Sequence, residues 1–457
     1  MPINSNHRIF QLNLEGFKSA QLLLEARNMS LKNYLKKIIP KSLQMTNTHF
    51  DFVLSSIARY LDHRCVSIDR IENTCNHLRD FPVIQQADHS NLLFDMETFL
   101  NNYLFSIGSK ESGASQIVIS QYSTVSCVCS LKPLTGPAYL RTRNNLYKIF
   151  PFSKQKLKKS NFCCLSEPLE TSFELLDGIE QKNDSMINNL SNRQFASGTE
   201  AFWVCNNEIW NNLNSTYIIP RVAIDESVTS ELLAMHITDK NSPIRRLLFD
   251  IDVRDSFIKR KREFVHSSKN RVMNRSIPDF FWYRHNSMLY PIELRGKNNN
   301  AKYYIAEKNI PFPVPYTPDN LASELRNGTL YGDIILSYFA RCLLPEITTI
   351  GGLSQQEYVE HHRNIFLDTH SCSPFLTKDE VQSLMRDDLS RLGGYPLLEL
   401  DTQVKKTLSW IDSKTDLDFF INDILPRPIW KTIGNFTCSE YLLYDLKKIR
   451  FKYNIAG

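Results

Sequence analysis

The sequence predicts an α/β protein whose core is a parallel or mixed sheet, with extensive added helices at both ends. Three observations support this fold class. Strand and helix patterns alternate between residues 81 and 120, as they do where a helix connects parallel strands. An apolar helix over 333–344 is followed by a short β-branched strand and the pair Gly351-Gly352. Helical spacing of apolar residues dominates before residue 80 and beyond Pro374.

The order of these patterns divides the chain into segments. They are an N-terminal helical segment (1–80), a first α/β segment (81–165), a loop or boundary (166–192), a second α/β segment that contains the glycine pair (193–372), and a C-terminal helical segment (373–457). The boundary is rich in Asn and Ser, which favour turns and loops. A chain of 457 residues is long enough for about two or three lobes.

Individual elements follow from local patterns. The strand expected at 81–84 leads into Gln85-Gln86-Ala87-Asp88-His89-Ser90, and Ser90 is a suitable N-cap for the apolar helix after it. Residues 116–120 form a largely apolar run with the length of a buried strand. Further along we expect strands at 217–225 and 289–295, a helix at 228–235, and an extended run at 310–316, where alternate prolines exclude a helix.

Composition narrows the class of protein. Hydrophobic residues make up 42% and charged residues 23% of the chain, which is ordinary for a folded soluble protein. No stretch approaches the roughly 18 consecutive apolar residues of a membrane-spanning helix. The first residues lack the apolar run and small-residue cleavage site of a secretory signal. We therefore expect a cytoplasmic protein with no membrane partner.

The chain contains 10 cysteines. Cys127 and Cys129 form one close pair, and Cys163 and Cys164 form another, but neither pair has the C-x-x-C spacing of a zinc site. Adjacent cysteines bridge each other only with strain. We expect reduced thiols that act as small buried hydrophobes, and no metal site; zinc binding and disulfides are the alternatives.

Basic residues cluster between residues 254 and 275, although the formal net charge is only +5. Such a run can follow a phosphate backbone. It carries few interleaved aromatic residues, however, and matches no nucleic-acid-binding module. A solvated helix face, or a loop over an anionic small molecule, explains the cluster better, so we do not expect a nucleic-acid partner.

The first candidate for chemistry is Asp88-His89, at the predicted junction between a strand and a helix. Ligands bind at strand ends of α/β sheets, and a histidine beside a carboxylate can move protons near neutral pH. Asp95 and Glu97 follow on the helix, on different faces, so only one of them would face the junction. We assign catalysis to Asp88, His89 and Glu97. The structural alternative is that Asp88 caps the helix and His89 bonds backbone carbonyls.

A second group of residues could bind an anionic part of a substrate or a nucleotide. Gln121 and Ser123 follow the strand at 116–120 and carry polar groups suited to a carboxylate or phosphate. Arg141 and Arg143 alternate along an extended segment, which would put both guanidinium groups on one face. The alternative is a turn followed by an exposed strand edge.

Backbone amides near Gly351-Gly352 would complete this anion site, because glycines at a strand-to-helix turn let a ligand approach the amides. Glu293 and Arg295 are further candidates, since both point to one face of the strand at 289–295. The alternative for Glu293 and Arg295 is that they pair with each other and with neighbours. His361 and His362 occupy adjacent helix positions and are poor joint metal ligands.

The segment Leu344-Pro345, Gly351-Gly352 and Tyr358 resembles the core motif of the bacillithiol-forming cysteine ligases. Members of that family also carry an Asp-His pair after an apolar strand, to which Val83-Ile84 and Asp88-His89 are similar. The resemblance implies a Rossmann-like core with added helices. It also implies an enzyme that attaches an amino acid to an acceptor amine. Tyr358 joins the binding residues on this basis, and a nucleotide is compatible with the motif.

Two functions remain open at this stage. The first is a small-molecule biosynthetic enzyme that condenses or ligates an amino-acid-like substrate with an acceptor, with a homodimer as one possible assembly. The alternative is a bacterial effector or host-interaction protein on an enzyme-like scaffold, because no strong catalytic motif is present. The first hypothesis requires that the chain after the strand at 81–84 and the glycine pair meet at the carboxyl edge of one sheet.

Overall fold

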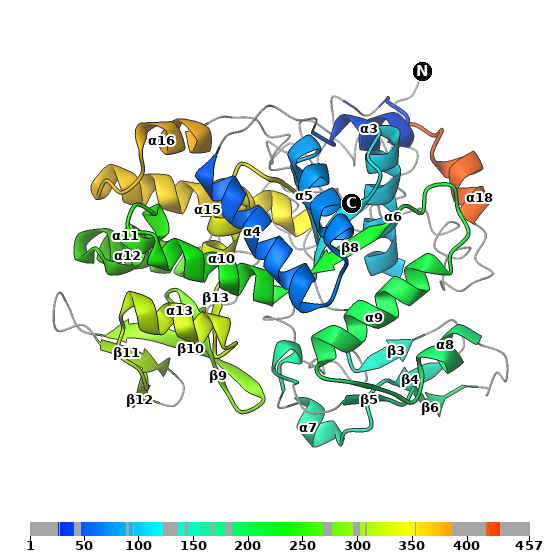
Figure 1. The fold of residues 1–457 in the computed structure, drawn as a ribbon, viewed down its shortest axis with the longest axis horizontal. Helices are drawn as coiled ribbons and strands as arrows, with labels where there is room; N and C mark the ends of the chain where they lie inside the picture. Colours follow the sequence, from blue (N-terminus) through cyan, green and yellow to red (C-terminus); the bar gives the residue numbers. More distant parts are fainter. Residues whose placement is uncertain are drawn as a thin grey trace, which may run out of the picture.

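A computed structural model describes residues 26, 28–40, 47–87, 91–94, 96–121, 136–141, 145–158, 160–165, 169–178, 185–267, 277–295, 302–306, 309–351, 353–385 and 417–429. Figure 1 shows most of the helices in the upper part of the molecule and the antiparallel strand regions at the lower left and lower right. The structure is a mixture of helices and strands, so the α/β class is confirmed.

A four-stranded parallel sheet lies at the centre of the fold. Its strands are β14 (Thr348–Ile350), β1 (Val83–Ala87), β2 (Ile117–Gln121) and β8 (Arg221–Ile224), in that spatial order. Every neighbouring pair runs parallel. β1 and β2 come from the first predicted α/β segment and the two other strands from the second, so both segments build the same sheet.

Two hydrophobic cores cover the two faces of this sheet, because successive strand residues point to opposite sides. Val83, Ile119 and Ile350 belong to the first core. It is completed by α3 (Leu31–Lys37), α6 (Met96–Glu111) and α9 (Gly198–Asn211).

Ile84, Val118 and Ile224 belong to the second core, on the opposite face. Its helices are α4 (Thr48–His63), α5 (Ile68–Asp80), α10 (Glu226–Thr238), α11 (Pro243–Phe249), α12 (Ile251–His266), α13 (Pro318–Arg326), α14 (Ile334–Tyr338), α15 (Leu353–Cys372) and α16 (Lys378–Met385). Most of the described residues beyond 220 therefore pack on one side of the sheet.

A five-stranded antiparallel sheet adjoins the second core. It contains β12 (Ile310–Pro311), β11 (Lys302–Ile305), β10 (Met288–Arg295), β9 (Phe281–His285) and β13 (Leu330–Gly332), in that order. Figure 1 shows it at the lower left, beside α13. The sequence predicted β10 and an extended run near 310, but not this sheet.

Two smaller strand regions lie at the lower right of Figure 1. One contains β3 (Tyr139–Arg141), β4 (Leu146–Lys148) and β6 (Glu174–Asp177), and the other pairs β5 (Leu169–Thr171) with β7 (Arg193–Phe195). The short helices α7 (Lys154–Lys158), η1 (Phe162–Cys164) and α8 (Ser185–Leu190) belong to the same part of the chain. The stretch 166–192, expected as a loop or boundary, thus contains β5, β6 and α8.

Residues 417–429 return to the beginning of the described chain. They contain α18 (Leu417–Phe419) and the π-helix η6 (Phe420–Ile424). The amides of Leu31 and Lys32 donate to the carbonyls of Arg427 and Leu425, at 2.9 and 3.1 Å. Figure 1 accordingly shows α18 close to α3, at the upper right.

The helix predicted over 333–344 begins as expected at the N-cap Asp333, whose carboxylate accepts from the Leu336 amide at 2.9 Å. After α14 it widens into the π-helix η4 (Phe339–Leu343). The Leu344 amide donates to the Phe339 carbonyl, five residues earlier, at 3.0 Å. Wide turns of this kind are rare and often occur at functional sites.

Several predicted boundaries were wrong. The strand predicted at 81–84 is β1, which begins at Val83 and continues through Gln85 and Gln86 to Ala87. The helix assigned to begin after Ser90 begins at Met96 instead. The side chain of Asn206 holds the segment before it, accepting from the Leu93 amide at 2.8 Å and donating to the Asn91 carbonyl at 3.0 Å. The strand predicted at 217–225 begins only at Arg221, directly after Pro220. No helix among the described residues combines the length and the apolar character needed to cross a bilayer.

Candidate active site

The carboxyl ends of β1 and β14 meet at one edge of the parallel sheet. Val83, Ile84 and Gln85 of β1 lie opposite Thr348, Thr349 and Ile350 of β14. Gly351, which is buried, follows directly. The sequence therefore predicted correctly that these two distant segments end side by side. Asp88, His89 and Gly352 continue from these strands but lie outside the described residues.

β2 and β8 end at the same edge. Gln121, the last residue of β2, is buried and lies opposite Ala87. Asp225 follows β8 and caps α10, accepting from the Ser227 amide at 2.8 Å. Its other carboxylate oxygen accepts from the Tyr60 hydroxyl and from Arg64, each at 3.0 Å. Asp225 is thus held by structural partners. Of the described residues at the ends of β1 and β2, Gln85, Gln86 and Gln121 carry amides and Ser120 carries a hydroxyl.

Gln85 and Gln86 are the most unusual polar residues at this edge. Gln85 is 0% exposed and Gln86 5% exposed. Within the described part of the chain, neither side-chain atom of the Gln85 amide has a hydrogen-bond partner, and neither does Oε1 of Gln86. A buried polar group without a partner costs about 1–3 kcal/mol. Such groups are rare in native proteins, and they indicate that something else supplies the hydrogen bonds.

Arg341 places a positive charge on the face of the sheet to which Gln86 points, because it contacts Ser120, which lies opposite Gln86; Gln85 points to the other face. Arg341 lies in η4 and is 1% exposed. Its Nη1 donates to Oγ of Ser120 at 2.8 Å and to Oγ1 of Thr229 at 3.3 Å. These contacts join the π-helix to the end of β2 and to the first turns of α10. A guanidinium group in such a dry position is the side chain best suited to a carboxylate or phosphate.

These groups lie in one row across the sheet. Gln86 lies opposite Ser120, and Ser120 lies opposite Ile224. The pairing of Gln85 with Ile350 puts Gly351 next to Gln86 at the following position of the register. Gly351, Gln86 and Ser120 are therefore neighbours, with Arg341 bonded to the last of them. The row combines a backbone amide, an amide oxygen, a hydroxyl and a cation.

The other predicted site residues fall in several places. Glu97 lies in α6, Arg141 in β3 and Tyr358 in α15. β3 belongs to the antiparallel group with β4 and β6, not to the parallel sheet. Ser123 and Arg143 lie outside the described residues. Of the predicted binding residues, the structure brings Gln121 and Gly351 to the common edge.

Glu293 and Arg295 lie in β10 of the antiparallel sheet. Their charged groups pair at 3.5 Å, and Arg295 stacks over the Tyr304 ring at 5.0 Å from its centroid. Arg295 also donates to Asn309. Glu293 and Arg295 therefore pair with each other and with neighbouring residues, which is the alternative to a role in a binding site.

The basic cluster that begins at Arg254 is largely neutralised where the structure describes it. Lys261 is 1% exposed and pairs with Asp333 at 2.5 Å, while Arg262 pairs with Asp279 at 2.7 Å. Lys261 also donates to the carbonyls of Pro278 and Asp279. Burial raises the pKa of the Asp333 carboxyl, against the lowering effect of Lys261. Lys261 thus holds α12 to the start of α14, and Arg262 holds it to the segment before β9; both cations are engaged in structural pairs.

The thiols of Cys163 and Cys164 lie 3.9 Å apart and are not joined. Burial raises the pKa of the Cys163 thiol well above its ordinary value, so it is protonated near neutral pH. Among the described residues, no group of three or more His, Cys, Asp or Glu side chains is arranged to hold a metal ion. The pair packs beside Tyr331 and Leu289 and connects η1 to the antiparallel sheet.

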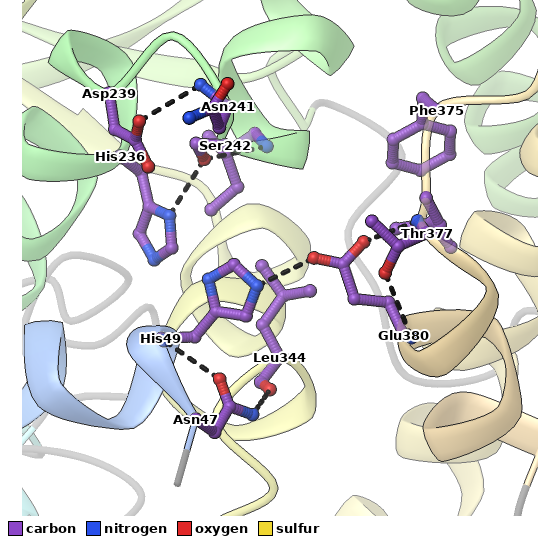
Figure 2. Close-up of polar contacts among 12 residues, drawn as sticks. Asn47, His49, His236, Asp239, Asn241, Ser242, Leu344, Phe375, Thr377 and Glu380 are labelled. Carbon is purple, nitrogen blue, oxygen red and sulfur yellow. Dashed lines mark hydrogen bonds and ion pairs between the residues drawn. The ribbon is translucent and has the colours of Figure 1, made fainter.

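A second polar cluster joins the starts of α4 and α16 to α10 (Figure 2). Nε2 of His49 lies 2.7 Å from Oε1 of Glu380, and Nδ2 of Asn47 donates to the Leu344 carbonyl at 2.8 Å. The ring of His49 stacks on that of His236, whose Nδ1 lies 2.9 Å from Oγ of Ser242. Figure 2 shows His49 between Glu380 and His236. Because His236 is 0% exposed, we assign this cluster a structural role.

Sequence patterns did not single out Gln85, Gln86 or Arg341 as site residues. A signal was present for Arg341, which is the only charged residue in the apolar run 334–344. Gln85 and Gln86 directly follow the apolar residues of the predicted strand. Polar residues at that point are expected wherever a strand ends, so their position did not distinguish them. Neither a scan against models of protein families nor a search of curated proteins finds a match to this chain.

Proposed function

We propose that this protein is a cytoplasmic enzyme of small-molecule biosynthesis that condenses or ligates an amino-acid-like substrate with an acceptor. The reaction would take place at the carboxyl edge of the parallel sheet, which we interpret as a Rossmann-like core. One observation carries the proposal. β1 and β14 are parallel neighbours, and the edge where both end holds buried amide groups of Gln85 that lack partners among the described residues.

The roles follow from chemistry. His89 and Asp88 come directly after β1 and would transfer protons, a contribution of about 10²–10⁴ in rate. The Gly351 amide and the Arg341 guanidinium would hold the anionic group of the substrate. Fixing two reactants beside each other can supply a further ~7–11 kcal/mol in favourable cases. A nucleotide would bind at the same edge if the reaction needs activation of a carboxylate.

The experiment is an unbiased activity assay on the purified full chain. The protein is incubated with pooled amino acids, 2-hydroxy acids and amines, with and without ATP, and condensation products are sought by mass spectrometry. We expect a new product with the wild type and a loss of about a hundredfold or more in His89→Ala. His63→Ala is the matched control, because His63 is an exposed histidine at the end of α4.

Two results would contradict the proposal. One is the absence of any product with a wild-type protein that is folded by circular dichroism. The other is equal product formation by the wild type and His89→Ala, which would remove His89 from the mechanism.

A further inference from the structure

Cys163 and Cys164 form a pair of reduced thiols that the proposed reaction does not use. Their sulfur atoms lie 3.9 Å apart in the short helix η1. We propose that the two thiols together bind a trivalent arsenical, a neutral thiophilic compound that attaches to two sulfurs at once. This inference goes beyond the proposed function and does not depend on it.

The first step is that the two cysteines are held in a fixed arrangement. The Cys164 amide donates to the Asn161 carbonyl at 3.0 Å. Asn161 is bonded in turn to the hairpin of β9 and β10: its amide donates to the Ser287 carbonyl at 2.8 Å, and its Oδ1 accepts from the Leu289 amide at 2.9 Å. The sulfurs are therefore positioned before a ligand arrives, which reduces the conformational entropy lost on binding.

The second step compares the spacing of the sulfurs with the spacing that different bonds require. Bonds between thiolate sulfur and an ion are about 2.3 Å long, and bonds from sulfur to arsenic are similar. Two sulfurs on one pyramidal centre, with bonds at roughly 90–110°, then lie ~3.3–3.8 Å apart. The observed 3.9 Å is close to this range. A linear ion would need ~4.6 Å, and a disulfide would need about 2.05 Å and would strain adjacent residues.

The third step distinguishes an arsenical from a metal ion by the number of ligands. Zinc takes three or four side chains in protein sites. In the part of the chain that the structure describes, no group of three or more His, Cys, Asp or Glu side chains is arranged to supply them. A trivalent arsenical carries its own third substituent, so the two thiols complete its coordination.

The fourth step concerns the protons of the thiols. Burial and the contact with Cys164 raise the pKa of the Cys163 thiol well above its ordinary value. A metal ion binds the thiolate and must displace that proton. An arsenical with an arsenic–oxygen double bond reacts with the neutral thiols instead. Two arsenic–sulfur bonds replace the bond to oxygen, the two thiol protons leave with the oxygen as one molecule of water, and nothing is oxidised.

The surroundings of the pair suit an arsenical with an apolar substituent. Leu289, Tyr331 and Trp282 of the antiparallel sheet form one apolar cluster with the two cysteines. Cys164 is 3% exposed, whereas Cys163 is half-buried. A ligand would therefore reach the pair from the side of Cys163, and an aryl group on arsenic would add to the apolar contacts of this cluster.

The test incubates the native full chain with phenylarsine oxide at neutral pH. Mass spectrometry of the intact protein and of its peptides counts the bound phenylarsenic groups and locates them. We expect one group on the peptide that contains Cys163 and Cys164, released by ethanedithiol but not by the same concentration of a monothiol. Peptide mapping separates this pair from Cys127 and Cys129, which lie outside the described residues.

Variants with one thiol test whether both sulfurs are needed. Cys163→Ala and Cys164→Ala should each weaken binding at this peptide about a hundredfold or more, because a single attachment loses the gain from two linked ones. Cys372→Ala is the matched control. Cys372 is an exposed cysteine at the end of α15, and its removal should leave binding at the pair unchanged.

Three outcomes would overturn the inference. The native protein could bind no phenylarsenic group at this peptide, a monothiol could release the group as readily as ethanedithiol, or the single-thiol variants could bind as tightly as the wild type. The chain unfolded in urea is the reference for the first outcome: binding there but not in the native protein would show that the packing of η1 shields the thiols. Failure of the proposed enzyme assay leaves these readouts unaffected.

Discussion

Gln85 of β1 lies opposite Ile350 of β14 in a parallel register, one residue before Gly351. This single pairing joins two parts of the chain that are far apart in sequence and makes their carboxyl ends neighbours. It also puts an amide with no partner among the described residues beside a buried glycine. The candidate site thus depends on the sheet, while its local motifs alone are ordinary.

Gln85→Met should raise the free energy of unfolding by about 1 kcal/mol, because it removes a buried amide that has no described partner. Activity should fall in the same variant if the amide contacts the substrate. Gln116→Met should instead lower the free energy of unfolding, since it removes the bond to the Asn73 carbonyl. Urea denaturation of both variants checks the prediction, and destabilisation of Gln85→Met would mean that the amide has a native partner.

Lys261→Met should destabilise the fold by about 3–5 kcal/mol, because it leaves Asp333 charged and buried without its partner. Lys259→Met is the matched control. Lys259 is on the same helix, with a side chain 71% exposed, and its loss should cost less than about 0.5 kcal/mol. Chemical denaturation at neutral pH compares the two, and similar midpoints would show that the buried pair contributes little.

Acid should destabilise the protein well above the pH at which carboxylates titrate. Burial lowers the pKa of His77 to about 4 and the pKa values of His236 and His362 to about 3. In the unfolded chain a histidine takes up its proton near pH 6.5. Between these values the unfolded state binds more protons, so the free energy of unfolding falls as the pH is lowered. Each group contributes up to about 1.4 kcal/mol per pH unit.

Denaturation curves between pH 7.5 and 5, expressed as the free energy of unfolding, measure this slope. His236→Gln should reduce it, because a glutamine at that position has no charge to gain. A slope in that variant equal to that of the wild type would show that His236 is not held neutral. Burial raises the pKa of Glu380, but its bond to His49 outweighs this effect and the net pKa is lowered. Glu380 therefore causes a further loss of unfolding free energy only as the pH falls through this lowered pKa.

Gly108→Ala should cost about 1–3 kcal/mol even though alanine is the better helix former. A Cβ at Gly108 would lie 2.6 Å from the Leu35 carbonyl oxygen, where α6 crosses α3. Gly198→Ala should cost less, because its Cβ would meet the Phe162 ring at 3.2 Å, and a side chain can shift by a few tenths of an ångström. Thermal denaturation shows which variant is destabilised more. A larger destabilisation by Gly198→Ala would contradict the packing of α3 on α6.

Local patterns predicted β2 and the start of the helix at Asp333, because both segments are largely apolar runs, but they predicted only the first half of β1, which continues through two glutamines to Ala87. Local patterns failed where a residue distant in the sequence determines the local structure. Residues 91–93 are kept out of the helix by Asn206, which belongs to α9. The position of Arg341 depends on Ser120 and Thr229, which no pattern around residue 341 could reveal.

The antiparallel sheet was missed although a signal for it exists. β9 is rich in aromatic residues and is joined to β10 by Asn286-Ser287, with Asn286 in the left-handed region at φ 57°. Asparagine is one of the few residues that adopt this conformation readily, and two-residue turns of this type connect hairpin strands. The hairpin could therefore have been predicted, whereas its pairing with β11 and β13 required the structure.

The strand order also has a consequence for biogenesis. Ribosomes release β1 and β2 early, but the partner of β1 on its other side is β14, which emerges only after about three quarters of the chain has been made. Until then one edge of β1 has no strand to pair with, and unpaired edges invite association between nascent chains. We therefore expect the recombinant protein to need slow expression or chaperone assistance.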